Sequence, residues 1–267
     1  MPDTKLRLED NSMGSSTMAC FEKDYAVQYY ETDQRGFARP VALLNYLQAA
    51  AGEHAALLGV AVADLRKSGH TWVLSRVHLA MERYPRGGNT VRIRTWPAIR
   101  NTLFTVRDFE LFDSEGVLIG RATTSWAVLN LKTRRPVKLA DVLPMYPLNP
   151  ERALNDTFST LPLLEQSEYE LRLPVLRGDL DLNRHVNNTV YAGWALETIP
   201  ESVESSCRLA SIEIGFRAEA LYGDTIVART ARAEYAGCYI HCIESGGDGR
   251  ELARLRTRWI PLETSHQ

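Results

Sequence analysis

The feature that most constrains the fold is a layout that occurs twice along this chain of 267 residues. Residues 30–37 form a polar, turn-like segment that leads into a helical run over residues 41–58. Residues 179–187 form a second polar segment, and residues 188–198 continue it as another helical run. A repeated order of turn and helix predicts that the chain folds as two similar units.

The similarity continues downstream of both helical runs. Residues 83–91 resemble residues 218–226, each as a strand, a turn and a second strand. A glycine-containing hairpin signal then precedes Trp126 in the first copy and Trp259 in the second. The first copy is longer before its first hairpin, which predicts a longer helix and an extra short segment through residues 64–67. Three ordered correspondences indicate a duplication.

Length and proline content divide the chain into parts. A length of 267 residues suggests about two domains. Five prolines between residues 136 and 162 interrupt regular elements and indicate a crossover between them. We expect a flexible tail over residues 1–19, a first domain over 20–140, a linker over 141–165 and a second domain over 166–267.

Each half presents one helical run followed by strands. Val91 and Ile93 alternate with Arg92 and Arg94, which is typical of a sheet covered on one side. The alternation of the next strand breaks after Asp108, which indicates a β-bulge there. A helix needs an apolar partner, and a curved sheet provides one. We therefore expect an α+β fold in which each half is a long helix wrapped by a curved antiparallel sheet.

The second polar segment carries groups that can do chemistry. If it is extended, Asp181, Asn183 and His185 point to one side, while Leu180 and Leu182 point to the other and can bury. The alternative is a plain turn that caps a helix, with the histidine as a bystander.

The helix after this segment has a recognisable start. Asn187 or Asn188 is the expected N-cap, and Tyr191, Trp194 and Ala195 fall on one helical stripe. The polar side chains would then lie beside free main-chain N–H groups, which suit a developing oxyanion.

Comparison of the two copies separates scaffold from chemistry. When Asp33 is aligned with Asp181, Arg35 stands opposite Asn183 and Phe37 stands opposite the histidine. The first copy therefore keeps the layout but lacks the amide and the imidazole. Only the second copy has the groups of an active site.

The second segment also carries a family resemblance. The run from Asp181 to Asn188, followed by Tyr191, Gly193-Trp194 and Leu196-Glu197, resembles the signature of plant and bacterial acyl-acyl-carrier-protein (acyl-ACP) thioesterases. The resemblance covers nearly the whole chain after residue 20 and implies a bacterial member with a double, or tandem, hot-dog fold. It implies that the first domain is non-catalytic and binds the acyl chain, while the second is catalytic.

The resemblance also implies site residues. They are Asp181, Asn183 and His185, together with an acid from the strand after the helix, which is Glu219. Ala220 stands where the family carries a cysteine, so a cysteine nucleophile is not expected. This catalytic set contains no metal and no cofactor.

The implied reaction is hydrolysis of fatty acyl-ACP to free fatty acid. We expect Glu219, helped by His185, to activate water as a general base. Asn183 and helix N-terminal amides would hold the carbonyl oxygen, and Asp181 would orient the amide or the imidazole. A covalent anhydride through Glu219 or Asp181 is the competing mechanism. An acyl-coenzyme A thioesterase and a non-catalytic acyl-binding protein are the alternative functions.

Charge and hydropathy limit the partners. The net charge of −2, from 31 basic and 33 acidic residues, argues against nucleic acid as a partner. A basic cluster could meet the acidic helix of an acyl carrier protein, although most such clusters are solvated loops; it comprises Lys132, Arg134, Arg135 and Lys138. The carrier-protein partner is therefore implied by the resemblance and not by this cluster.

Location follows from three further observations. No stretch approaches the roughly 20 apolar residues of a membrane span, and residues 1–19 resemble neither a secretory signal nor a transit peptide. Four cysteines without metal-ligand spacing fit a reducing compartment. We expect a cytoplasmic protein that is a monomer or a homodimer.

Overall fold

A computed structural model describes residues 19–262. The tail expected over residues 1–19 lies outside this range except for its last residue. Within residues 19–262, no helix is long and apolar enough to cross a membrane.

The described chain contains strands in two sequence blocks and a few helices. The strands are β1 (Phe21–Ala26), β2 (His70–Met81), β3 (Thr90–Arg100), β4 (Phe104–Phe112), β5 (Leu118–Asn130), β6 (Tyr169–Pro174), β7 (Cys207–Phe216), β8 (Thr225–Arg232), β9 (Cys238–Ser245) and β10 (Glu251–Pro261). The α-helices are α1 (Pro40–Leu57), α2 (Val62–Lys67), α3 (Leu139–Val142), α4 (Asn188–Leu196) and α5 (Glu201–Ser206).

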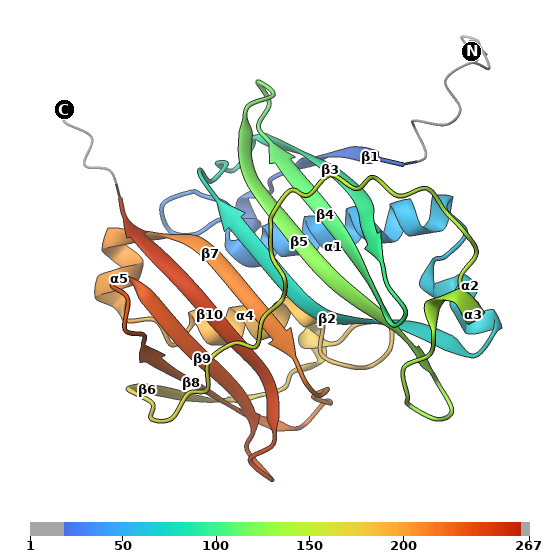
Figure 1. The fold of residues 1–267 in the computed structure, drawn as a ribbon. Helices are drawn as coiled ribbons and strands as arrows, with labels where there is room; N and C mark the ends of the chain where they lie inside the picture. Colours follow the sequence, from blue (N-terminus) through green and yellow to red (C-terminus); the bar gives the residue numbers. More distant parts are fainter. Residues whose placement is uncertain (1–18, 263–267) are drawn as a thin grey trace, which may run out of the picture.

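All ten strands join one antiparallel sheet in the order β1-β3-β4-β5-β2-β7-β10-β9-β8-β6. The first five positions come from the first half of the chain and the last five from the second half. Pairing of β2 with β7 joins the halves, so the sheet runs without interruption across the molecule (Figure 1). The expected α+β class is confirmed.

Helices α1 and α4 cover one face of this sheet, one for each half (Figure 1). Helix α1 has 18 residues and α4 has 9. Gly59, just beyond α1, takes a φ of 69°, which suits glycine at a helix end. Helix α2 follows at once, so the longer first helix and the extra segment are both confirmed. The helices meet where the Thr189 hydroxyl donates to Asn45 Oδ1 at 2.8 Å.

The chain between the halves lies across the opposite face of the sheet (Figure 1). Trp96 of β3 donates its indole N–H to the carbonyl of Glu151 at 2.9 Å. Asp108 of β4 is fully buried and accepts from Arg152 Nε and Ala153 N, both at 2.8 Å.

This cover corrects one expectation about β4. The pairing of β4 with β5 is regular through Asp108, so the bulge expected there is wrong. Side chains of β4 are buried on both faces, and the inter-half segment covers the outward position Asp108.

Candidate active site

Residues 181–185 form a tight turn, so the expectation of an extended segment is wrong. The carboxylate of Asp181 causes the turn, because its Oδ1 accepts the main-chain N–H groups of Asn183 at 2.7 Å and His185 at 3.3 Å. Arg184 takes a left-handed φ of 63° to close it. Leu182, which the extended pattern would bury, is 99% exposed at the tip.

The first copy folds into the same turn. Asp33 Oδ1 accepts the N–H groups of Arg35 at 2.9 Å and Phe37 at 3.0 Å, and Gly36 takes the left-handed position with a φ of 80°. The structure thus shows a shared scaffold whose amide and imidazole occur only in the second copy.

Helix α4 begins directly after the turn. Asn187 is the N-cap, as expected, and its side chain accepts from Thr189 N at 3.2 Å. The N–H of Asn188, the first helical residue, has no acceptor within residues 19–262. Tyr191, Trp194 and Ala195 are buried, which confirms the predicted stripe.

Glu219 lies in an irregular segment just after β7 and not within a strand. Its Oε1 is 3.3 Å from His185 Nδ1, which brings the imidazole and the acid together. The next residue, Ala220, donates its N–H to the Tyr191 hydroxyl at 3.0 Å. Burial of Tyr191 raises its pKa to about 12, so its hydroxyl stays neutral and holds the segment.

The four expected residues therefore converge, but not as four separate groups. Asn183 donates from Nδ2 to Asp181 Oδ2 at 3.2 Å, forming one pair. His185 and Glu219 form the other pair. Asp181 orients the amide with its side-chain oxygens and touches the histidine only through the main chain.

Two arginines at the site were missed by sequence reasoning. Arg66 of α2 donates to Asn183 Oδ1, and Arg134, in the turn after β5, donates to Glu219 Oε2 at 2.5 Å. The partners are separated by 117 and 85 residues, so no local pattern connects them. The only signal was the basic cluster that contains Arg134.

All four residues line one cavity of about 1060 Å³. The cavity extends from the turn along α1, past Gly52 and Ala55, to Trp72 and Val73 at the start of β2. Both arginines line it as well. Its walls therefore come from both halves.

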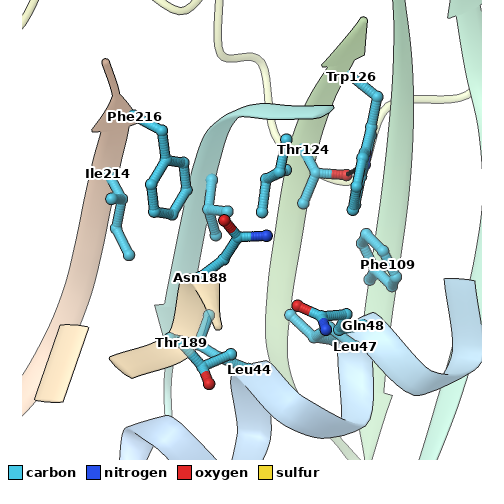
Figure 2. Close-up of a pocket in the computed structure, with 12 residues that line it drawn as sticks. Leu44, Leu47, Gln48, Phe109, Thr124, Trp126, Asn188, Thr189, Ile214 and Phe216 are labelled. Atoms are coloured by element: carbon cyan, nitrogen blue, oxygen red, sulfur yellow. Dashed lines mark hydrogen bonds between the residues drawn. The ribbon is translucent and has the colours of Figure 1, made fainter. Parts of the chain in front are cut away.

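A smaller pocket of about 20 Å³ adjoins the cavity and shares lining residues with it. Figure 2 shows Asn188 and Gln48 converging there from the two helices, with Phe109 and Trp126 from the first half and Phe216 from the second. Asn188 lines both the cavity and this smaller pocket, so the start of α4 lies where the two meet.

One cluster outside this site has metal-ligand character. In the described range, His78, Asp156 and Glu213 offer ligand atoms within 4.8 Å of one another. Glu213 is held bidentately by Arg256 at 2.7 and 2.9 Å, and Asp156 accepts from the imidazole at 2.7 Å. These contacts tie the inter-half segment to β2.

The cysteines play no part in the candidate site. Cys20, Cys207, Cys238 and Cys242 are free, and the last two lie on β9 as alternating strand residues. Ala220, which stands at the cysteine position implied by the resemblance, is buried.

Comparisons with known proteins bear on the whole chain. The family model of the acyl-ACP thioesterase N-terminal domain matches residues 18–144, and that of the C-terminal domain matches residues 164–261. Oleoyl-acyl carrier protein thioesterase 1 of Arabidopsis thaliana is 30% identical over 273 residues, which cover 90% of this chain and 75% of the relative.

Solved structures agree with the sequence comparisons. The 12:0-ACP thioesterase of Umbellularia californica aligns with a TM-score of 0.80 and 26% identity, covering 91% of this chain and 98% of that one. An acyl-ACP thioesterase of Bacteroides thetaiotaomicron aligns with a TM-score of 0.81 and 24% identity over the same shares of the two chains. The fold is a double hot-dog, and this chain belongs to the acyl-ACP thioesterase family.

Proposed function

We propose that this protein hydrolyses fatty acyl-ACP thioesters to free fatty acid and holo-carrier protein, which ends or edits fatty acid synthesis. The observation that carries the proposal is that two pairs of polar side chains line one large cavity. They are Asp181 with Asn183, and His185 with Glu219. Family membership supports the thioester as the bond that is cleaved.

The imidazole–carboxylate pair supplies the base. Glu219 and His185 are 3.3 Å apart and both line the cavity, so a water molecule between them and a bound thioester can lose its proton to this pair. The thiolate leaves readily, so acid assistance at the sulfur is not needed.

The Asp181–Asn183 pair supplies a hydrogen-bond donor for the carbonyl oxygen of the thioester. Asn183 uses one Nδ2 hydrogen on Asp181 and keeps the other for the carbonyl oxygen. The N–H of Asn188 at the start of α4 is a second donor of the kind that stabilises an oxyanion.

The hydrogen bonds of the two carboxylates indicate which of them could form the anhydride of the covalent alternative. An attack by Asp181 would break the turn, because its Oδ1 accepts two main-chain N–H groups, whereas the described contacts of the Glu219 carboxylate are with the side chains of His185 and Arg134. An anhydride, if formed, would therefore form on Glu219. Single turnover in H₂¹⁸O tests the anhydride that water opens at the Glu219 carbonyl carbon, because that route leaves ¹⁸O in this side chain, whereas direct attack by water on the thioester places ¹⁸O in the fatty acid.

We further propose a division of labour between the domains. Residues 20–140 form the acyl-binding domain and residues 166–267 the catalytic one, joined by the linker over 141–165. The cavity wall formed by α1 and β2 supports this division, because it continues from the catalytic pair into the first half. The acyl carrier protein as partner follows from the family, while a cytoplasmic location and a monomeric or dimeric state stay predictions.

The decisive experiment is a product profile on a panel of acyl-ACP chain lengths with the wild type and Glu219→Gln. The variant should lose turnover by about 10²- to 10⁴-fold, because the amide cannot accept the proton of water. Its circular dichroism and melting temperature should match the wild type. Glu234→Gln, an exposed change in the same half, is the matched control and should keep full activity.

Each other result contradicts a part of the proposal. Near-normal turnover by Glu219→Gln would remove Glu219 as the base. Faster hydrolysis of a matched acyl-coenzyme A than of acyl-ACP would make acyl-coenzyme A the substrate in place of acyl-ACP. Tight acyl binding by the wild type without release of fatty acid would indicate a binding protein.

A further inference from the structure

The catalytic groups belong to the second half, but two of them are held by side chains of the first half. Arg134 contacts Glu219 Oε2, and Arg66 contacts Asn183 Oδ1. Both arginines line the cavity beside their partners. Each pair of catalytic groups is thus in contact with one guanidinium from the opposite half.

The turn that carries Arg134 is built to present it. Asn130, the last residue of β5, accepts the N–H groups of Lys132 and Thr133 with its side-chain oxygen and that of Arg134 with its carbonyl. Arg134 closes the turn with a φ of 58°, a left-handed conformation that is rare for residues other than glycine. Such strain is retained where the surroundings impose it, often at functional sites.

Glu219 has few other restraints on its side chain. It lies in an irregular segment, and 40% of its side chain is exposed. Oε1 faces His185 at 3.3 Å and Oε2 receives Arg134, so the two contacts together fix the plane of the carboxylate. Without the guanidinium, the carboxylate would be free to rotate away from the imidazole.

Arg66 does the equivalent for the amide. Its guanidinium donates to Asn183 Oδ1, while Nδ2 of the same amide donates to Asp181. Because the oxygen is occupied by a donor, Nδ2 must be the end that meets the carbonyl of a bound thioester. The contact therefore selects the orientation that oxyanion binding needs.

We propose that the first half completes the active site, with Arg134 as the positioning residue of Glu219 and Arg66 as the positioning residue of Asn183. This inference rests on the proposed function of that site. The degenerate half then contributes to the chemical step as well as to acyl binding, although its two arginines act only through Glu219 and Asn183.

Exposure distinguishes this role from simple stabilisation of the fold. The side chains of Arg134 and Glu219 are 58% and 40% exposed, and ion pairs of this kind contribute little to folding. Loss of the guanidinium should therefore change kcat much more than thermal stability.

The test compares Arg134→Met, Arg134→Lys and Arg135→Met in steady-state hydrolysis of one acyl-ACP. Arg134→Met should lower kcat by about 10- to 100-fold, with little change in KM. Arg134→Lys should restore part of the rate. Arg135, exposed and outside the cavity lining, should be neutral.

A double-mutant cycle links the effect to Glu219. In a Glu219→Gln background, Arg134→Met should add almost nothing, because the group that it positions is already inactive. A parallel pair, Arg66→Met against its exposed neighbour Lys67→Met, should show the same loss of kcat only for the first.

The outcomes separate this inference from the proposed function. A raised KM with unchanged kcat for Arg134→Met would make the arginine a binding residue and overturn the inference. Unchanged kinetics would overturn it equally. Either result leaves the proposed site intact if Glu219→Gln is inactive, whereas an active Glu219→Gln would remove both.

Discussion

Asp33 and Asp181 make the same main-chain hydrogen bonds in two turns of identical layout. Asp33 does so in a copy without amide or imidazole, so holding the turn is a sufficient reason for an aspartate at either position. We therefore expect Asp181 to act indirectly in the proposed reaction: it shapes the turn and contacts the amide of Asn183.

Replacing each aspartate with alanine should separate the two roles. Asp33→Ala and Asp181→Ala should each lower the free energy of unfolding by about 1–3 kcal/mol, because two main-chain donors lose their acceptor. Only Asp181→Ala should also lower kcat, by about 100-fold, since misplacing a catalytic group costs that much. Urea unfolding and acyl-ACP hydrolysis measure the two effects. An equal loss of kcat in both variants would contradict the distinction.

Sequence reasoning identified residues whose role is set by near neighbours. The sequence predicts an N-cap at Asn187 or Asn188, and Asn187 is the N-cap observed; a cap can be predicted because it is defined by the next two or three residues. Leu182 was misjudged because alternation cannot reveal a side chain that folds the backbone back on itself. Arg66 and Arg134 were missed because their contacts depend on how the two halves pack.

Strands β8, β9 and β10 enclose a buried polar element. His241 of β9 is fully buried, with Nδ1 at 2.6 Å from Thr230 Oγ1 and Nε2 at 2.8 Å from Thr257 Oγ1. Burial lowers the pKa of this imidazole to about 3, so it is neutral in the folded protein. An unfolded chain would restore the ordinary pKa of about 6.5.

This element should make the fold sensitive to acid. Between about pH 6.5 and 3 the unfolded state binds the extra proton, so stability falls as pH falls, by up to about 1.4 kcal/mol per pH unit. His241→Gln should be less stable at neutral pH but should show a shallower loss between pH 6.5 and 4.5. Urea unfolding at several pH values gives the free energy of unfolding of both proteins. The two curves of this free energy against pH should be parallel above pH 7. Parallel curves over the whole pH range would contradict a neutral, buried His241 as the cause of the acid sensitivity.

The elements themselves were largely predictable. Helical and alternating periodicities reflect burial on one face, and they predicted α1, α4 and β3. The prediction failed for β4, where Asp108 is buried on the outward face beneath Arg152. Periodicity assumes that the outer face is solvated, and a covering segment distant in sequence removes that assumption.

At the scale of the molecule, the cavity crosses the boundary between the halves. The turn over residues 181–185 forms one end, while α1 and β2 form the wall in the first half. Gly52 of α1 lies on this wall, and a Cβ added there would meet no atom within 4 Å. A larger side chain at this position would occupy cavity space without disturbing the packing of the protein.

Gly52→Leu should therefore shift chain-length preference. The kcat/KM for the longest acyl-ACP substrates should fall by about tenfold or more, while that for the shortest should change little, because only long chains compete for the filled volume. Leucine favours the helix more than glycine, so the fold should not weaken. Gly52→Ala is the matched control. A uniform loss over all chain lengths would contradict acyl binding along α1.

The pairing of β2 with β7 has a further consequence. These are equivalent strands of the two copies, and they pair antiparallel about His78 and Glu213, with Val77 opposite Ile214 and Leu79 opposite Ile212. Such a register is that of an isologous contact, in which two identical partners meet about a twofold axis. The chain thus has the form of a symmetric dimer fused into one polypeptide. Because the two copies are joined in one chain, their sequences can diverge from each other. The first copy could therefore lack the amide and the imidazole while its surface still formed part of the cavity.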